Sequence, residues 1–174
     1  EKVIAANPWD DQGVYLQVTR GAAPRDHVYP KEVPPTVFVS ASAQVPPSQE
    51  AVAHGVSAIT HADIRWLRCD IKTTALVANC MLRNLAVRAG CAEVILLRDG
   101  FLTEASSCNV FVVRHGVALA PPKSHLMLPG ITYDVVLELM EKSGVPHALR
   151  EITEEGLREA DEIWLTSSSR EVVA

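Results

Sequence analysis

One lysine in this sequence has surroundings that could serve covalent chemistry. Lys72 follows the run Arg68-Cys69-Asp70-Ile71 and stands just ahead of the clearest predicted helix. A cation in that position meets the unfavourable end of a helix dipole, so Lys72 is either an ordinary surface lysine or one kept there for a purpose. The chemistry open to it is Schiff-base formation, a role in which burial lowers the pKa of the amine.

An acidic residue lies further along the chain, among small hydroxyl side chains. Glu104 belongs to the run Leu102-Thr103-Glu104-Ala105-Ser106, between two predicted hairpins. Such a residue usually lies in a solvated turn. A carboxylate held beside a sheet can instead keep a heteroaromatic nitrogen protonated, which is what an electron-sink cofactor requires.

Two further segments have the composition of phosphate-binding sites. Ile131 and Thr132 follow Pro129-Gly130 at the start of a predicted helix, where free amide groups favour an anion. Thr132 either adds a hydroxyl donor there or only caps the helix. Ser167 and Ser168 lie in a hydroxyl-rich run that leaves a predicted buried strand, and form either a second phosphate contact or an ordinary loop.

Arg25 and His27 lie two positions apart in a loop rich in glycine and proline. Arginine binds a carboxylate through its forked donors, and a histidine can add another hydrogen bond. The alternative is that both side chains are simply solvated. The remaining histidines do not show the spacing of metal ligands, so we predict no metal site.

Composition narrows the class of protein. The 174 residues carry 16 Lys and Arg against 21 Asp and Glu, a formal net charge of −5, which argues against a nucleic-acid-binding protein. The four cysteines form no CxxC pair and are expected to be free thiols in a reducing compartment, the cytoplasm. No apolar run approaches the ~20 residues that cross a bilayer, and no secretory leader is visible. Because the sequence begins at Glu1 and ends in a β-like run, we expect a piece of a longer protein.

The pattern of apolar residues predicts an α+β fold, rich in sheet and barrel-like. A hairpin is expected at Asp99-Gly100, and the main helix is expected to begin after Thr73 or Thr74 and to stop at Gly90. The predicted strands are 13–19, 36–40, 55–59, 93–98, 110–113, 117–120 and 163–165, and the predicted helices are 75–89, 133–142 and 154–160.

Four separated motifs, in this order, closely resemble the class IV pyridoxal-phosphate aminotransferases, and in particular the members that act on D-amino acids. They are Tyr15 to His27, Asp70-Ile71-Lys72, Leu96 to Glu104 with Ser107 and Asn109, and Leu128 to Thr132. The resemblance covers the chain from about Gly13 to Val173. It implies pyridoxal 5'-phosphate as cofactor, and residues 13–174 as the large cofactor-binding domain. Residues 1–12 would then be the remnant of a linker from a small N-terminal domain, and further C-terminal strands would follow.

The resemblance also implies a role for each candidate residue. Lys72 would form the Schiff base and move the proton between substrate and cofactor, while Glu104 would pair with the pyridinium nitrogen. Arg25 and His27 would hold the substrate carboxylate, on a loop that reaches the neighbouring site of a homodimer. The remaining cofactor contacts would be Leu128 against the ring, Ile131 and Thr132 at the phosphate, and Ser167 and Ser168 at its other side.

The activity so implied is transfer of an amino group from a D-amino acid to a 2-oxo acid. A 4-amino-4-deoxychorismate lyase has the same fold, but the Arg25-x-His27 pair favours the transaminase. A branched-chain aminotransferase is disfavoured because that pair is not expected in it and because it handles the opposite enantiomer. A cofactor-binding domain without turnover is the remaining alternative.

Overall fold

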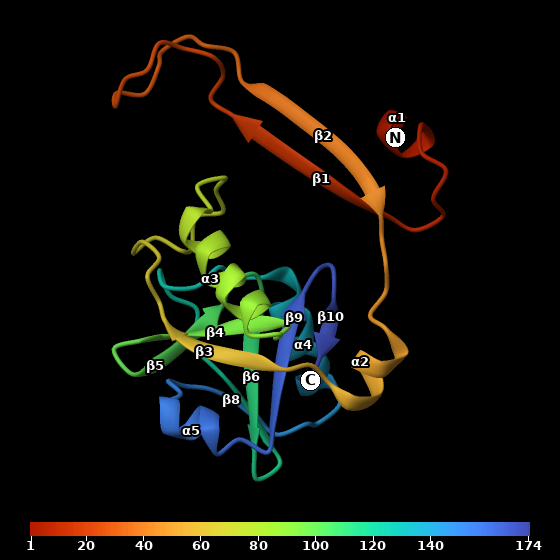
Figure 1. Ribbon diagram of the computed structural model, residues 1–174, viewed down its shortest axis with the longest axis vertical. Coiled ribbons are helices and arrows are strands. Elements are labelled where there is room, and N and C mark those ends of the chain that lie inside the picture. The colour runs from red at the N-terminus through yellow and green to blue at the C-terminus, as the bar shows by residue number, and fades with distance from the viewer. The chain divides into compact units, whose positions relative to one another are not determined.

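The computed structural model describes residues 1–174, and the chain forms two compact units, Glu1–Pro46 and Pro47–Ala174 (Figure 1). The expected domain boundary after residue 12 stays a prediction. None of the helices is long and apolar enough to cross a membrane.

The first unit is built on one antiparallel hairpin. A short helix, α1 (Lys2–Ala5), precedes β1 (Gln12–Thr19), which pairs with β2 (Thr36–Ala43) along its whole length. Both strands were predicted, because apolar residues alternate along β1. One face of the hairpin is apolar, since Leu16 lies opposite Val39 and Val18 opposite Val37. The loop between the two strands carries Arg25 and His27.

The second unit contains two open sheets. The smaller has the order β3-β4-β5, formed by β3 (Ala58–Ala62), β4 (Glu93–Arg98) and β5 (Phe101–Ala105). β3 and β4 are parallel and are connected through α3 (Val77–Arg88). β4 and β5 form the predicted hairpin, in which Asp99 and Gly100 both have positive φ, 51° and 84°. This backbone conformation is the one that an Asp-Gly turn favours.

The larger sheet has the order β10-β9-β6-β7-β8. Its strands are β6 (Asn109–Arg114), β7 (Val117–Ala120), β8 (His147–Leu149), β9 (Glu162–Ser167) and β10 (Glu171–Val173). The helices around it are α2 (Gln49–His54), α4 (Ile131–Lys142) and α5 (Glu154–Arg158). The α+β, sheet-rich class is confirmed. A barrel is not, because neither sheet closes on itself.

The larger sheet lies between the smaller sheet and α4. Along β6, Val110 and Val112 pack with Ile95 and Leu102 of the smaller sheet. Phe111 points the other way and packs with Tyr133 of α4, at a ring-centroid distance of 4.9 Å. This alternation is the period of two of a strand that is buried on both faces. It brings the start of β6, the end of β9 and the start of α4 together in one core.

Several element boundaries differ from the predictions. The strand expected at 55–59 lies at Ala58–Ala62 and follows α2, which Ser48 caps through its Oγ. Neither Thr73 nor Thr74 is the N-cap of α3, which is Leu76. Thr73 Oγ1 instead accepts a hydrogen bond of 3.1 Å from Ala75 N, which holds a local turn ahead of the helix.

The helix predicted at 133–142 begins earlier, at Ile131, and its N-cap is Gly130, so Thr132 does not cap it. The helix predicted at 154–160 ends at Arg158. β8 was not predicted, since its three residues are too short to show a period.

Candidate functional site

The second unit contains a buried carboxylate near the end of β5, in the β4–β5 hairpin. Glu104, on β5, is only 5% exposed. Its Oε1 accepts hydrogen bonds from Arg65 Nη1 and, at 3.1 Å, from the backbone amide of Leu128. Its Oε2 accepts one long hydrogen bond, of 3.3 Å, from Asn109 Nδ2. The position predicted from sequence to be a solvated turn or a functional carboxylate is therefore buried and fixed.

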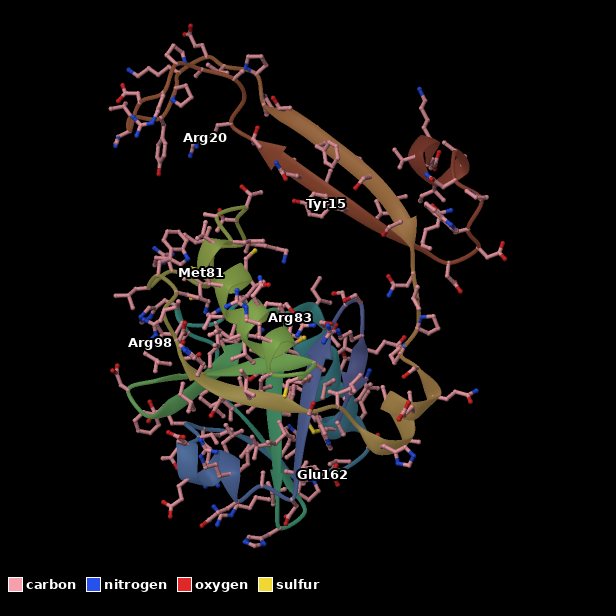
Figure 2. The ribbon with its side chains drawn as sticks, in the orientation of Figure 1. Tyr15, Arg20, Met81, Arg83, Arg98 and Glu162 are labelled. Atoms are coloured by element: carbon pink, nitrogen blue, oxygen red, sulfur yellow. The ribbon has the colours of Figure 1, made fainter.

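Glu104 ends a chain of charges that alternate in sign. Arg98 Nη2 lies 3.1 Å from Asp63 Oδ2, Asp63 binds Arg65 through both of its oxygens, and Arg65 binds Glu104. Figure 2 shows Arg98 near the end of β4. All four side chains are at most 15% exposed. Charges this deeply buried are found in proteins when they are paired, and here each cation lies against at least one carboxylate.

The two carboxylates of this chain titrate differently. Burial raises the pKa of Asp63, but the hydrogen bonds and charge of Arg65, with a contribution from Arg98, outweigh it and lower the pKa to about 2. Burial also raises the pKa of Glu104, to about 6, although Arg65 and the amide of Leu128 oppose it. The same burial therefore has opposite outcomes: the pKa of Asp63 is lowered by its two arginine partners, whereas the pKa of Glu104 stays raised.

Asn109 connects this carboxylate to the loop that leads into α4. Its Nδ2 donates both to Glu104 and, at 2.9 Å, to the carbonyl of Leu128. Leu128, a predicted ring-packing residue, is half-buried, and its backbone is bonded on both sides: the amide to Glu104 and the carbonyl to Asn109. The loop is therefore locked against the end of β5.

The predicted phosphate-binding residues lie on both sides of Asn109. Asn109 pairs with Thr166 across β6 and β9, which puts Ser167 at the next position of β9. On the other side, Asn109 Oδ1 lies against Gly130, the N-cap of α4, so Ile131 and Thr132 open the helix beside it. No side chain caps α4, which leaves its first amide groups for another acceptor. Ser168 lies on the exposed turn after β9.

Lys72 lies on a segment bonded to the same loop. It is exposed and belongs to the irregular stretch between β3 and α3. Three residues earlier, Cys69 N donates to the carbonyl of His125 at 2.8 Å, and Arg65 Nη2 donates to the carbonyl of Leu126 at 3.2 Å. The segment that carries Lys72 and the hairpin that carries Glu104 are thus both attached to residues 125–128.

Arg25 and His27 belong to the first unit, where both are exposed. Between them, Asp26 Oδ1 accepts a hydrogen bond of 2.6 Å from the backbone amide of His27. At the base of the loop, the Arg20 guanidinium stacks 3.8 Å from the centroid of the Tyr29 ring (Figure 2). Their part in substrate binding stays a prediction.

Comparison with known protein families shows to which family the chain belongs. The model of the family described as amino-transferase class IV matches residues 1–174. The chain belongs to the class IV aminotransferases. A D-alanine aminotransferase of Bacillus licheniformis is 42% identical over 173 residues, which are 99% of this chain and 61% of the relative. This class IV chain therefore spans less than two thirds of the length of that curated relative.

Solved structures of related enzymes have the same fold. A fold IV transaminase of Curtobacterium pusillum superposes with a TM-score of 0.78 at 27% identity, over 93% of this chain and 55% of that one. The branched-chain aminotransferase of Thermoproteus uzoniensis with norvaline superposes with a TM-score of 0.75 at 26% identity. That match covers 91% of this chain and 55% of the other. The predicted fold type is confirmed by these likenesses.

Sequence reasoning missed the charged partners of Glu104. Arg65 lies 39 positions before it, in the stretch Ile64-Arg65-Trp66, which has no recognisable motif. Asp63, at the end of β3, looks like an ordinary polar residue after a strand. The signal available was weak: two charges, one on each side of Ile64, in a segment between two regular elements.

Proposed function

We propose that this chain is the cofactor-binding part of a pyridoxal-phosphate-dependent transaminase that moves the amino group of a D-amino acid to a 2-oxo acid. The observation that carries the proposal is the 42% identity to a D-alanine aminotransferase over 99% of the chain. The buried carboxylate of Glu104 supports it, because its chemistry suits the ring nitrogen of that cofactor.

The donors and acceptors of the site fit the parts of pyridoxal 5'-phosphate. The uncapped amides at Ile131 and Thr132 suit a phosphate. Ser167 ends the neighbouring strand β9, and Ser168 begins the turn after it. Glu104 has one oxygen with a single weak partner, which suits a protonated ring nitrogen. Leu128 would pack against the ring, on a backbone held at both its amide and its carbonyl.

When bound, the cofactor supplies an aldehyde that takes up the amino group and a ring that withdraws electrons from the reacting carbon. Lys72 would hold the cofactor covalently through its amine, and the same amine would carry a proton between the substrate Cα and the cofactor. Glu104 would hold a proton at the ring nitrogen throughout, which stabilises negative charge developing at the reacting carbon.

A branched-chain aminotransferase is the second candidate, favoured by the TM-score of 0.75 to the Thermoproteus uzoniensis enzyme. The lower identity, 26% against 42%, makes it the weaker one.

Arg25 and His27 would provide the substrate carboxylate site of the D-specific enzyme, since both side chains are exposed and can meet an anion.

We infer a homodimer and a cytoplasmic location as well. The apolar face of the β1–β2 hairpin has no cover within its own unit, which suits an interface. All four cysteines are free thiols, as in proteins of a reducing compartment. Sedimentation equilibrium tests the dimer: a monomer at all concentrations contradicts it.

Substrate choice is tested by a half-reaction. The chain loaded with pyridoxal 5'-phosphate is mixed with D-alanine, L-alanine or L-leucine, and the 2-oxo acid formed is measured. We expect pyruvate from D-alanine only. An oxo acid from L-leucine and none from D-alanine identifies the branched-chain alternative. Bound cofactor without any product identifies a cofactor-binding domain that does not turn over.

A further inference from the structure

The chain Arg98–Asp63–Arg65–Glu104 is more elaborate than stability requires. Buried ion pairs contribute little net stability compared with well-packed apolar side chains, because desolvation of the charges offsets their attraction. Asp63 and Arg65 lie outside the four motifs that carry the family resemblance, and Arg98 lies within the motif that ends at Glu104. Their arrangement is explained if the last group, Glu104, must be held in one orientation and one charge state.

The two oxygens of Glu104 are not equivalent. Oε1 is occupied by Arg65 Nη1 and by the amide of Leu128. Oε2 receives only the 3.3 Å hydrogen bond from Asn109. An ionised carboxylate has about four acceptor positions, so Oε2 keeps the capacity for a further strong donor.

Arg65 is itself fixed on every side. Its Nε and Nη2 each donate to Asp63 at 2.9 Å, and Nη2 also donates to the carbonyl of Leu126 at 3.2 Å. Because the guanidinium is planar and rigid, these contacts determine where Nη1 lies. The carbonyl of Arg65 is bonded as well, to Arg98 Nη2 at 2.9 Å.

We propose that Arg65 is a positioning residue for the cofactor, which binds Oε1 of Glu104 and so keeps this carboxylate ionised and turned with Oε2 toward the ring nitrogen. The inference rests on the proposed function, since it needs a cofactor with a protonated ring nitrogen. Asp63 and Arg98 act through Arg65. Asp63 holds the guanidinium of Arg65 and balances its charge, and Arg98 holds the backbone carbonyl of Arg65.

The charge of Glu104 is the balance of opposing effects. Burial raises its pKa, the guanidinium of Arg65 lowers it, and the negative charge of Asp63 raises it again. The thiol of Cys69 also lies close to the cluster, and its own pKa is raised, chiefly by burial. Arg65 is therefore the nearest cation that favours the ionised form of Glu104.

The test begins with the full chain free of cofactor. The side-chain carboxyl of Glu104 is followed by carbon NMR against pH, in glutamate-labelled protein, and assigned with Glu104→Gln. We expect Arg65→Gln to raise the pKa of Glu104 by about one to three pH units, and Arg65→Lys to raise it less. Arg68→Gln is the matched control, because Arg68 pairs with Asp70 on the surface. An equal pKa of Glu104 in wild type and Arg65→Gln overturns the proposal.

Cofactor affinity provides the second readout. Arg65→Lys keeps the positive charge but loses the forked donors of the guanidinium. We expect it to raise the Kd for pyridoxal 5'-phosphate about tenfold or more, and we expect Arg68→Gln to leave that Kd unchanged. The Arg65→Lys variant keeps the test open if Arg65→Gln does not fold, since an unchanged Kd also overturns the proposal. Failure of the wild type to bind the cofactor is a different result: it contradicts the proposed function and the role of Arg65 together.

Discussion

Asn109 Oδ1 lies so close to Gly130 that a Cβ on this glycine would be 2.3 Å away from it. Asn109 also holds Glu104 and the loop before α4, so this approach links the buried carboxylate to the N-terminus of the helix. Only a residue without a side chain allows both to stay in place.

We therefore expect Gly130→Ala to lower the free energy of unfolding by about 1–3 kcal/mol and to weaken phosphate binding, as measured by urea unfolding and cofactor titration. Gly156→Ala is the control, because its Cβ would meet Thr153 Oγ1 at an ordinary 3.4 Å within α5. That change should leave stability equal or slightly raised. Equal stability of Gly130→Ala and wild type would show that Asn109 moves aside without cost.

Asp63 is expected to be the most costly of the acidic residues to neutralise. Asp63→Asn leaves Arg65 and Arg98 without their shared anion in a buried site, which should lower the free energy of unfolding by about 3 kcal/mol. Asp70→Asn breaks the exposed pair with Arg68 and should leave it nearly unchanged. Denaturant unfolding of both variants decides, and similar losses in the two would contradict the buried network.

The raised pKa of Glu104 has a consequence for stability against pH. Its pKa is about 6 in the folded protein and 4.5 ordinarily, so between these values the folded state binds more protons than the unfolded state. The contribution of Glu104 to the free energy of unfolding is therefore fully present below pH 4.5 and falls as the pH rises to about 6. In Glu104→Gln this decrease in the free energy of unfolding between pH 4.5 and about 6 should be absent. The control Glu138→Gln, which changes an exposed carboxylate, should still show the decrease. Parallel pH profiles of wild type and Glu104→Gln would refute the assignment.

Arg25 is predicted to bind the substrate carboxylate. In the loaded protein, Arg25→Ala should raise KM for D-alanine about 10- to 100-fold, as expected for loss of one charge-assisted contact, without a change in cofactor affinity. Lys31→Ala removes another exposed cation of the same loop and should leave KM unchanged. Equal effects of the two changes would indicate general attraction by the loop and not a specific contact.

Regular elements could be predicted where local chemistry determines them. The alternation along β1, the Asp99-Gly100 turn and the apolar stripe of α3 each depend on neighbouring residues only. The predicted position of β3 was wrong by three residues, and α2 was not predicted, because short segments with small residues carry little periodic signal. β3 and β4 pair in parallel and are connected through α3. A short sequence pattern cannot predict this pairing, because the two strands lie about 30 residues apart in the chain.

The site divides in the same way. Lys72, Glu104 and Thr132 stand in motifs, so their sequence neighbours make them candidates, and their roles stay predictions. Arg65 and Asp63 stand in no motif, and only the folded structure shows that they belong to the site. The reason is that the contact of Arg65 with Glu104 joins residues 39 positions apart. The pKa of Glu104 could not be predicted either, since it depends on burial and on those distant partners.

Covalent capture at Lys72 tests the account most directly. The full chain is incubated with pyridoxal 5'-phosphate and reduced with borohydride, and the modified peptide is located by mass spectrometry. We predict a single modified lysine, Lys72, with no modification in Lys72→Ala and full modification in the control Lys142→Ala, whose lysine pairs with Glu138 on the surface of α4. Modification that persists at another lysine in Lys72→Ala, or none in the wild type, would contradict it.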